Sequence, residues 1–184
     1  LAVPKSVWVV IDEAYFEYLD HPQYGSALCL MERFENLIIT RTFSKIYGLA
    51  SLRLGYGVTS SRFADLLNRA RQPFNVGGLT LAAGVAALSD DEFVIESRQK
   101  NEKGLRQLEK GLDELGLPWI PSGGNFLAVD CDRDGQELFR ELLKEGVIVR
   151  AIGEYGMPNY IRVSVGLPEE NARFLNSLAK VLGA

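Results

Sequence analysis

The chain has 184 residues and is 47% hydrophobic, which is enough apolar material for the core of one domain or of two small ones. Its formal net charge of −4 provides no broad basic field, so the composition argues against a nucleic-acid partner and favours small molecules. Cys29, Cys131 and the single histidine, His21, support neither a disulfide framework nor a zinc site. No apolar run reaches the length of a membrane span, and we expect a protein of the reducing cytoplasm.

The first half of the chain alternates predicted strands and helices. A continuous apolar run over residues 7–11 predicts a strand buried on both faces, and polar residues follow it in the sequence D-E-A-Y. Such a strand needs neighbours on both sides, and the chain opens on Leu1 rather than Met, so we expect a fragment of a longer protein. Further strands are predicted over 37–39 and 52–58, and helices over 26–34, 61–70 and 79–88.

A charged helix over residues 89–115 is the predicted link between two domains, residues 1–90 and 91–184. Beyond it, strands are predicted over 119–120, 126–129, 147–149 and 160–165, with helices over 135–145 and from 168 onward. The alternation in the last strand places Arg162 on a polar face. We therefore predict an α/β protein in which a mostly parallel sheet is followed by a small α+β domain.

The stretch T-R-T-F-S-K-I-Y-G-L-A-S-L-R-L-G-Y-G, residues 40–57, combines cations, hydroxyls and glycines directly after a predicted strand. Thr42, Ser44 and Arg53 offer the hydroxyl donors and the guanidinium fork that hold a phosphate dianion. A lysine amine beside them, Lys45, indicates a phosphorylated aldehyde as the ligand, as in pyridoxal phosphate enzymes. Taken alone, however, a lysine such as Lys45 is far more often a solvated surface charge than a Schiff-base former, and it is the neighbouring residues that favour the second interpretation.

A pyridoxal phosphate enzyme also needs an acid beside the pyridine nitrogen and a cation for the substrate carboxylate. Asp12, at the carboxyl end of the first predicted strand, suits the first task, and Tyr15 could hydrogen-bond the phenolic oxygen of the ring. Arg162 has the planar fork for the second task. The simpler interpretations remain open, because Asp12 also suits a turn cap and Arg162 a solvated strand residue.

Four segments of the chain resemble the motifs of the histidinol-phosphate aminotransferases, which are fold-type I enzymes that use pyridoxal 5'-phosphate. These segments are D-E-A-Y, the lysine stretch, R-Q-P-F-N-V and Y-G-M-P-N-Y-I-R-V-S-V-G. The resemblance implies that Lys45 holds the cofactor as a Schiff base and shuttles the substrate proton. It implies that Asp12 pairs with the pyridine nitrogen, that Tyr15 meets the ring oxygen and that Arg162 holds the α-carboxylate. Cofactor phosphate would then be bound by Thr42, Ser44 and Arg53.

The resemblance also implies what the whole protein does. It implies transamination of histidinol phosphate with glutamate or 2-oxoglutarate in histidine biosynthesis, by a cytoplasmic homodimer. It covers only the second half of such an enzyme, with residues 1–90 in the cofactor-binding large domain and 91–184 forming the small C-terminal domain. Aromatic aminotransferases and threonine-phosphate decarboxylases have similar motifs and remain alternatives, as does a non-catalytic sensor domain of the same fold.

Overall fold

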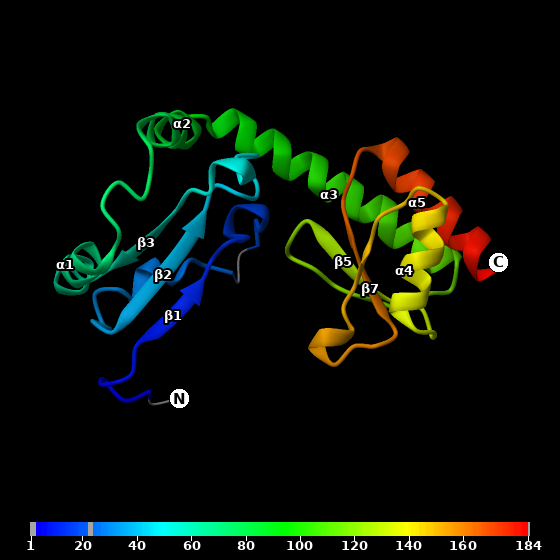
Figure 1. The fold of residues 1–184 in the computed structure, drawn as a ribbon, viewed down its shortest axis with the longest axis horizontal. Helices are drawn as coiled ribbons and strands as arrows, with labels where there is room; N and C mark the ends of the chain where they lie inside the picture. The colour runs from blue at the N-terminus through cyan, green and yellow to red at the C-terminus, as the bar shows by residue number, and fades with distance from the viewer. Residues whose placement is uncertain (1–2, 22–23, 184) are drawn as a thin grey trace. The chain divides into compact units, whose positions relative to one another are not determined.

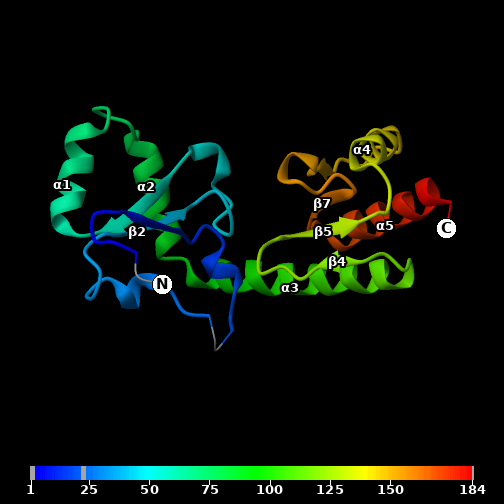
Figure 2. The same cartoon turned by 90° about the horizontal axis from the view of Figure 1, so that it is seen from below.

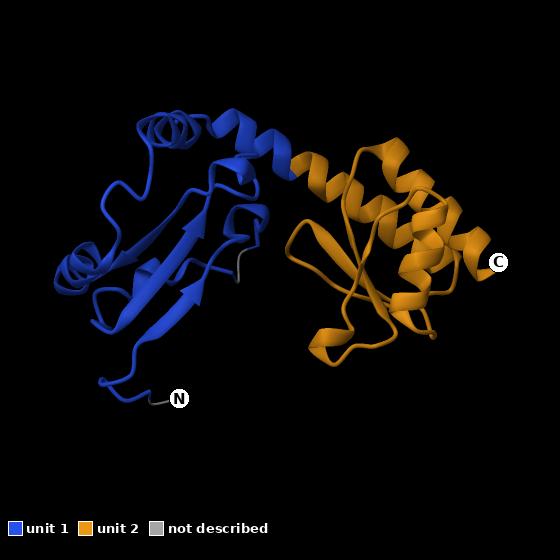
Figure 3. Ribbon diagram, in the orientation of Figure 1, with its two compact units in different colours: residues 1–98 blue, residues 99–184 orange. Residues whose placement is uncertain are grey.

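The structure is a computed structural model that describes residues 3–21 and 24–183. The chain divides into two compact units, residues 1–98 and 99–184 (Figure 3). With η marking short 3₁₀ helices, the elements in chain order are β1 (Val9–Asp12), η1 (Phe16–Tyr18), η2 (Ala27–Leu30), β2 (Leu37–Thr42), η3 (Ala50–Leu52), β3 (Gly55–Thr59), α1 (Ser61–Ala70), α2 (Gly78–Leu88), α3 (Asp91–Glu114), β4 (Trp119–Ile120), β5 (Phe126–Asp130), α4 (Gly135–Lys144), β6 (Arg150–Ala151), η4 (Gly153–Tyr155), β7 (Tyr160–Ser164) and α5 (Pro168–Leu182).

The first unit is built on a three-stranded sheet in the order β1-β2-β3 (Figure 1). β1 runs parallel to β2, with Val9 opposite Leu37 and Asp12 opposite Thr40, whereas β3 runs antiparallel to β2. A mostly parallel sheet was expected, and the described strands form a mixed one instead. The antiparallel pair arises because the short connection through η3 turns the chain straight back onto β2.

The apolar run that forms β1 is not covered on both faces, so that prediction is wrong for this chain. Val10 is 59% exposed, and Val7 and Trp8 are also exposed. The reason is that β1 is an edge strand of the described sheet, with β2 as its neighbour. Trp8 finds partial cover by stacking on Phe63 of α1, with ring centroids 3.8 Å apart.

The small core of the first unit lies under the segment that follows β2. Ile39 of β2 is fully buried, and Phe43, Ile46 and Leu54 are nearly so. α2 packs tightly against this segment, because a Cβ on Gly84 would lie 2.4 Å from Leu54 Cδ2. The loop after β2 is therefore anchored by apolar side chains at both ends.

α3 is one continuous helix of 24 residues (Figure 2). Asp91 and Glu92 occupy its first turn, where negative charges interact favourably with the helix dipole. The division between the two units falls within it, after Arg98. Across residues 3–21 and 24–183, we find no helix with both the length and the apolar composition that crossing a bilayer requires.

The second unit is an antiparallel four-stranded sheet, in the order β4-β5-β7-β6, with its helices packed on one face (Figure 1). Its core is made by α3, α4, α5 and the two central strands, through Leu108, Leu112, Leu127, Val129, Leu138, Leu142, Ile161, Val163, Phe174 and Leu178. Arg162 lies on the opposite face of β7, so the predicted alternation is confirmed.

The strand predicted over residues 147–149 lies slightly later, at Arg150–Ala151. Gly146 adopts φ +75°, and the amide of Val147 donates to Leu142 O at 2.9 Å. The backbone amide of Val147 therefore closes the C-terminus of α4 and is not available to pair with a neighbouring strand.

Candidate active site

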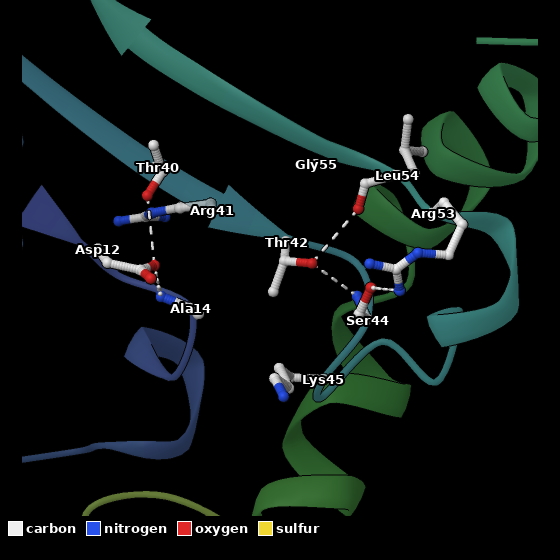
Figure 4. Close-up of a pocket in the computed structure, with 10 residues that line it drawn as sticks. All are labelled: Asp12, Ala14, Thr40, Arg41, Thr42, Ser44, Lys45, Arg53, Leu54 and Gly55. Carbon is white, nitrogen blue, oxygen red and sulfur yellow. Dashed lines mark hydrogen bonds between the residues drawn. The ribbon is translucent and has the colours of Figure 1, made fainter. Parts of the chain in front are cut away.

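A pocket of about 420 Å³ lies at the carboxyl ends of β1 and β2 (Figure 4). Ligands of open α/β sheets bind at this end of the strands. The residues that line the pocket are Asp12, Ala14, Thr40, Arg41, Thr42, Ser44, Lys45, Arg53, Leu54 and Gly55. Five residues predicted from the sequence, Asp12, Thr42, Ser44, Lys45 and Arg53, therefore share one pocket.

Asp12 ends β1 directly opposite Thr40 of β2. Its Oδ1 atom accepts hydrogen bonds from the Thr40 hydroxyl at 3.2 Å and from the backbone amide of Ala14 at 3.1 Å. The expectation that Asp12 caps the following turn is thus confirmed. The same two bonds orient a carboxylate at one side of the pocket, as Figure 4 shows.

Thr42, Ser44 and Arg53 form a connected cluster at the other side of the pocket (Figure 4). The amide of Ser44 donates to Thr42 Oγ1 at 3.0 Å, and Arg53 Nη1 donates to Ser44 Oγ at 3.4 Å and to Ala50 O at 2.9 Å. Arg53 adopts a left-handed backbone with φ +52°, where the chain turns from η3 towards β3. A guanidinium and two hydroxyls held together in this way can bind an anion.

Lys45 follows β2 in the anchored loop. Phe43 and Ile46 on either side of it are buried, and the amide of Gly48 closes the turn by donating to Lys45 O at 2.9 Å. The Nζ atom of Lys45 lies 4.9 Å from the ring centroid of Tyr15, which follows β1. Tyr15 is not among the residues that line the pocket, but its ring contacts the amine of Lys45, which does line it.

An ion pair between the pocket-lining residue Arg41 and the buried residue Glu13 was missed in the sequence. Glu13 is 3% exposed, and its Oε2 atom accepts from Arg41 Nε at 3.1 Å and Nη2 at 2.8 Å. Glu13 also accepts from the hydroxyl of Ser26 at 2.8 Å and from the amide of Ala27 at 2.6 Å. Burial alone would raise the pKa of the Glu13 carboxyl, but the Ala27 amide, the Arg41 guanidinium and the Ser26 hydroxyl together hold it below its ordinary value.

The remaining predicted residue, Arg162, belongs to the second unit. It lies on the polar face of β7, opposite Ala128, and its guanidinium carbon is 5.0 Å from the ring centroid of Phe126. Its Nε atom is buried and has no hydrogen-bond partner within the described part of the chain. A half-buried guanidinium with a donor to spare is suited to receiving a carboxylate.

The α/β fold is that of a known enzyme class. Residues 1–178 match the family model of aminotransferase class I and II, and the chain belongs to this family. It is 56% identical over 180 residues to histidinol-phosphate aminotransferase 2 of Pseudomonas fluorescens, an alignment that covers 98% of this chain and 49% of that protein. The chain spans about half the length of the curated relatives it matches.

Solved structures agree with this fold. The crystal structure of histidinol-phosphate aminotransferase from Sinorhizobium meliloti in complex with pyridoxal-5'-phosphate superimposes with a TM-score of 0.91 at 29% identity, over 98% of this chain and 50% of that one. The L-threonine-O-3-phosphate decarboxylase of Porphyromonas gingivalis has a TM-score of 0.81 at 22% identity, over 95% and 55% of the chains, and shares the fold alone. The α/β class predicted from the sequence is confirmed.

Proposed function

We propose that this chain is part of a pyridoxal-phosphate-dependent histidinol-phosphate aminotransferase, which transfers an amino group between histidinol phosphate and the 2-oxoglutarate/glutamate pair in histidine biosynthesis. The observation that carries the proposal is that Lys45, the Thr42–Ser44–Arg53 cluster and Asp12 line one pocket. The relative at 56% identity supports the choice of substrate. In the same proposal, residues 1–90 are the later part of the cofactor-binding large domain and residues 91–184 are the small domain.

The residues present fit this cofactor. A phosphate requires positive charge and hydrogen-bond donors, which Arg53 and Ser44 offer within one connected cluster. An aldehyde requires a primary amine, which Lys45 brings to the same pocket. A pyridine nitrogen that must stay protonated requires an acceptor, and the Asp12 carboxylate is held in place for that by Thr40.

When bound, pyridoxal phosphate would supply an electron sink for the charge left when the substrate loses its α-proton. Asp12 would hold the proton on the pyridine nitrogen. Arg53, with Ser44 and Thr42, would bind the phosphate and so fix the orientation of the ring. The Nζ atom of Lys45 would bind the aldehyde in the resting enzyme, and during the reaction it would take the proton from the substrate α-carbon and return it. Arg162 would bind the α-carboxylate of either substrate.

We further propose that the complete enzyme is a cytoplasmic homodimer that takes a small-molecule amino donor and a 2-oxo acid. The resemblance to the family is one support for this. A second is the apolar surface that the first unit leaves open, since Leu79 and Val85 of α2 are 90% and 68% exposed. Exposed apolar residues of this extent are typical of surfaces that another polypeptide segment or subunit covers.

The test uses the complete protein that contains this chain, assayed with 2-oxoglutarate and either histidinol phosphate, phenylalanine or O-phosphothreonine. We expect amino transfer from histidinol phosphate with a kcat/KM at least about tenfold above that for phenylalanine. Lys45→Ala should abolish the transfer, and Lys5→Ala, at an exposed position, should leave it unchanged. Release of CO₂ from O-phosphothreonine without amino transfer would instead identify a decarboxylase.

A further inference from the structure

The two acidic residues at the end of β1 serve opposite faces of the sheet. Asp12 pairs with Thr40, and the amide of Glu13 donates to Thr40 O at 2.9 Å, so the parallel pairing continues one residue past the strand. Successive side chains of a strand point to opposite faces. Asp12 therefore contacts Thr40 on one face of the sheet, whereas Glu13 contacts Arg41 on the other face.

The contacts of Glu13 and Arg41 join four segments of the first unit. Arg41 belongs to β2, and Glu13 belongs to the chain leaving β1. Glu13 Oε1 binds the amide of Ala27, the first residue of η2, and the Arg41 guanidinium lies 4.3 Å from the ring centroid of Phe16 in η1. The ion pair thus ties both strand ends to the two short helices that follow β1.

A need for stability alone does not account for this arrangement. Arg41 occupies the same face of β2 as Leu37 and Ile39, which are buried, so an apolar residue would continue that face. Buried ion pairs are often no more stabilising than apolar packing, and their best-attested use is to select one arrangement over others. The arrangement selected here is the alignment of β1 with β2.

That alignment decides where the pocket residues lie. Asp12 reaches the pocket on β1, whereas Thr42 and Lys45 reach it on β2 and the loop after it. A shift of one strand end along the other would therefore displace the acid from the amine. A displacement of 1 Å of a reacting group can lower a rate by about 100-fold.

We propose that Glu13 and Arg41 are positioning residues for the site: their ion pair fixes the end of β1 against β2 and so holds Asp12 in its place opposite Lys45. The inference rests on the proposed function, in which Asp12 keeps the ring nitrogen of the cofactor protonated. Neither residue of the pair is assigned a contact with substrate or cofactor.

The test compares variants of the complete, cofactor-loaded enzyme. The double variant Glu13→Gln/Arg41→Met removes both charges of this pair, and it also removes the cation that lies 3.8 Å from Glu17 Oε1. Asp12→Asn is the reference for a lost acid. The matched control is Asp65→Asn/Arg69→Met, which removes an exposed ion pair on α1 of the same unit, with side chains 68% and 67% exposed.

Two readouts separate positioning from a merely structural role. The first is the pH titration of the absorbance of the lysine-bound cofactor, whose midpoint we expect to shift by about one unit in the double variant, in the same direction as in Asp12→Asn. The second is the division between kcat and KM: kcat should fall about 10- to 100-fold while KM for the donor stays within about threefold. The control should match the wild type in both, and Arg41→Lys, which keeps the charge without the fork, should lie between.

The outcomes distinguish the two claims. If the wild type holds the cofactor and the double variant has the same titration midpoint and the same kcat as the wild type, the positioning role is wrong while the proposed function stands. If the wild type holds no cofactor, the proposed function falls, and the positioning role falls with it. Should the double variant fail to fold, Arg41→Lys carries the same comparison, and wild-type values in both readouts would overturn the inference.

Discussion

The Nζ atom of Lys45 lies 4.9 Å from the centre of the Tyr15 ring. The two residues follow different strands, Lys45 after β2 and Tyr15 after β1, and meet because these strands are parallel and end at the same edge. A cation over an aromatic face is stabilised by about 0.5–2 kcal/mol. The contact holds the amine of Lys45 beside the pocket that Asp12 and Ser44 also line.

The Glu13–Arg41 pair should matter for stability once one partner is removed. In Arg41→Met, the Glu13 carboxylate would remain at a site that is 3% exposed, without its cation. We expect the free energy of unfolding of the complete apoprotein, measured with urea, to fall by about 3–5 kcal/mol. Arg69→Met, which breaks an exposed pair, should cost no more than about 1 kcal/mol. Equal losses in the two variants would show that burial of the pair has no effect.

The stability of the first unit should also depend on pH through Glu13. Its pKa in the folded state lies below the ordinary value of 4.5, so its contribution is complete above pH 4.5 and is lost as the pH falls through the folded-state pKa. The melting temperature of the apoprotein should therefore fall less steeply below pH 4.5 in Glu13→Gln than in the wild type. Parallel curves would contradict this.

Glu17 opposes this trend. Burial raises the pKa of its carboxyl, with Arg41 lowering it and Glu13 raising it further. A raised pKa means that stability from Glu17 declines as the pH rises from its unfolded-state pKa to its folded-state pKa. The pH titration of Glu13→Gln should therefore be compared with that of Glu13→Gln/Glu17→Gln, so that the two slopes are separated.

Arg53 should set the affinity for the cofactor phosphate. Arg53→Lys keeps the positive charge but loses the fork that reaches Ser44 Oγ and Ala50 O. We expect the dissociation constant of pyridoxal phosphate, measured by equilibrium dialysis of the complete protein, to rise about tenfold, which corresponds to about 1.4 kcal/mol. Arg62→Lys on the exposed surface of α1 is the control. An unchanged dissociation constant in Arg53→Lys would remove Arg53 from the phosphate site.

Gly55 allows β3 to approach the end of β2. A Cβ at this position would lie 2.8 Å from the backbone oxygen of Arg41, which cannot move without disturbing the strand pairing. Gly55→Ala should lower the free energy of unfolding by about 1–3 kcal/mol. Gly78→Ala, where a Cβ has nothing within 4 Å at the start of α2, should instead be neutral or stabilising by up to about 1 kcal/mol. Gly55→Ala with wild-type stability would show that the strands can separate at no cost.

The sequence was most informative about the type of each element. The apolar spacing over 61–70 predicted α1, and alternation over 160–165 predicted β7 with Arg162 on its polar face; both are confirmed. The prediction that the first strand is buried on both faces was wrong. A continuous apolar run shows that a strand is suited to such burial, but it does not show that the covering neighbours belong to the same chain. The short helix predicted over 26–34 is only the 3₁₀ turn of η2, whose first amide is bound by Glu13.

The pocket was predicted through residues that follow strands, because parallel strands bring such residues to one edge. Thr40 was missed, since its bond to Asp12 depends on the register of two strands, which composition does not reveal. Arg41 offered a usable signal. It falls on the same face of the predicted strand as Leu37 and Ile39, and a charged residue on a buried face requires a partner. That partner, Glu13, is 28 residues away and could be identified only once the strands were paired.

The central claim is that Lys45 is the amine that binds the cofactor. It is tested most directly by treating the complete protein, loaded with pyridoxal phosphate, with sodium borohydride and mapping the reduced adduct by peptide mass spectrometry. We predict the adduct on the peptide that contains Lys45 in the wild type and in Lys5→Ala, and its loss in Lys45→Ala. A stoichiometric adduct on another lysine, or no adduct in the wild type, would contradict the account.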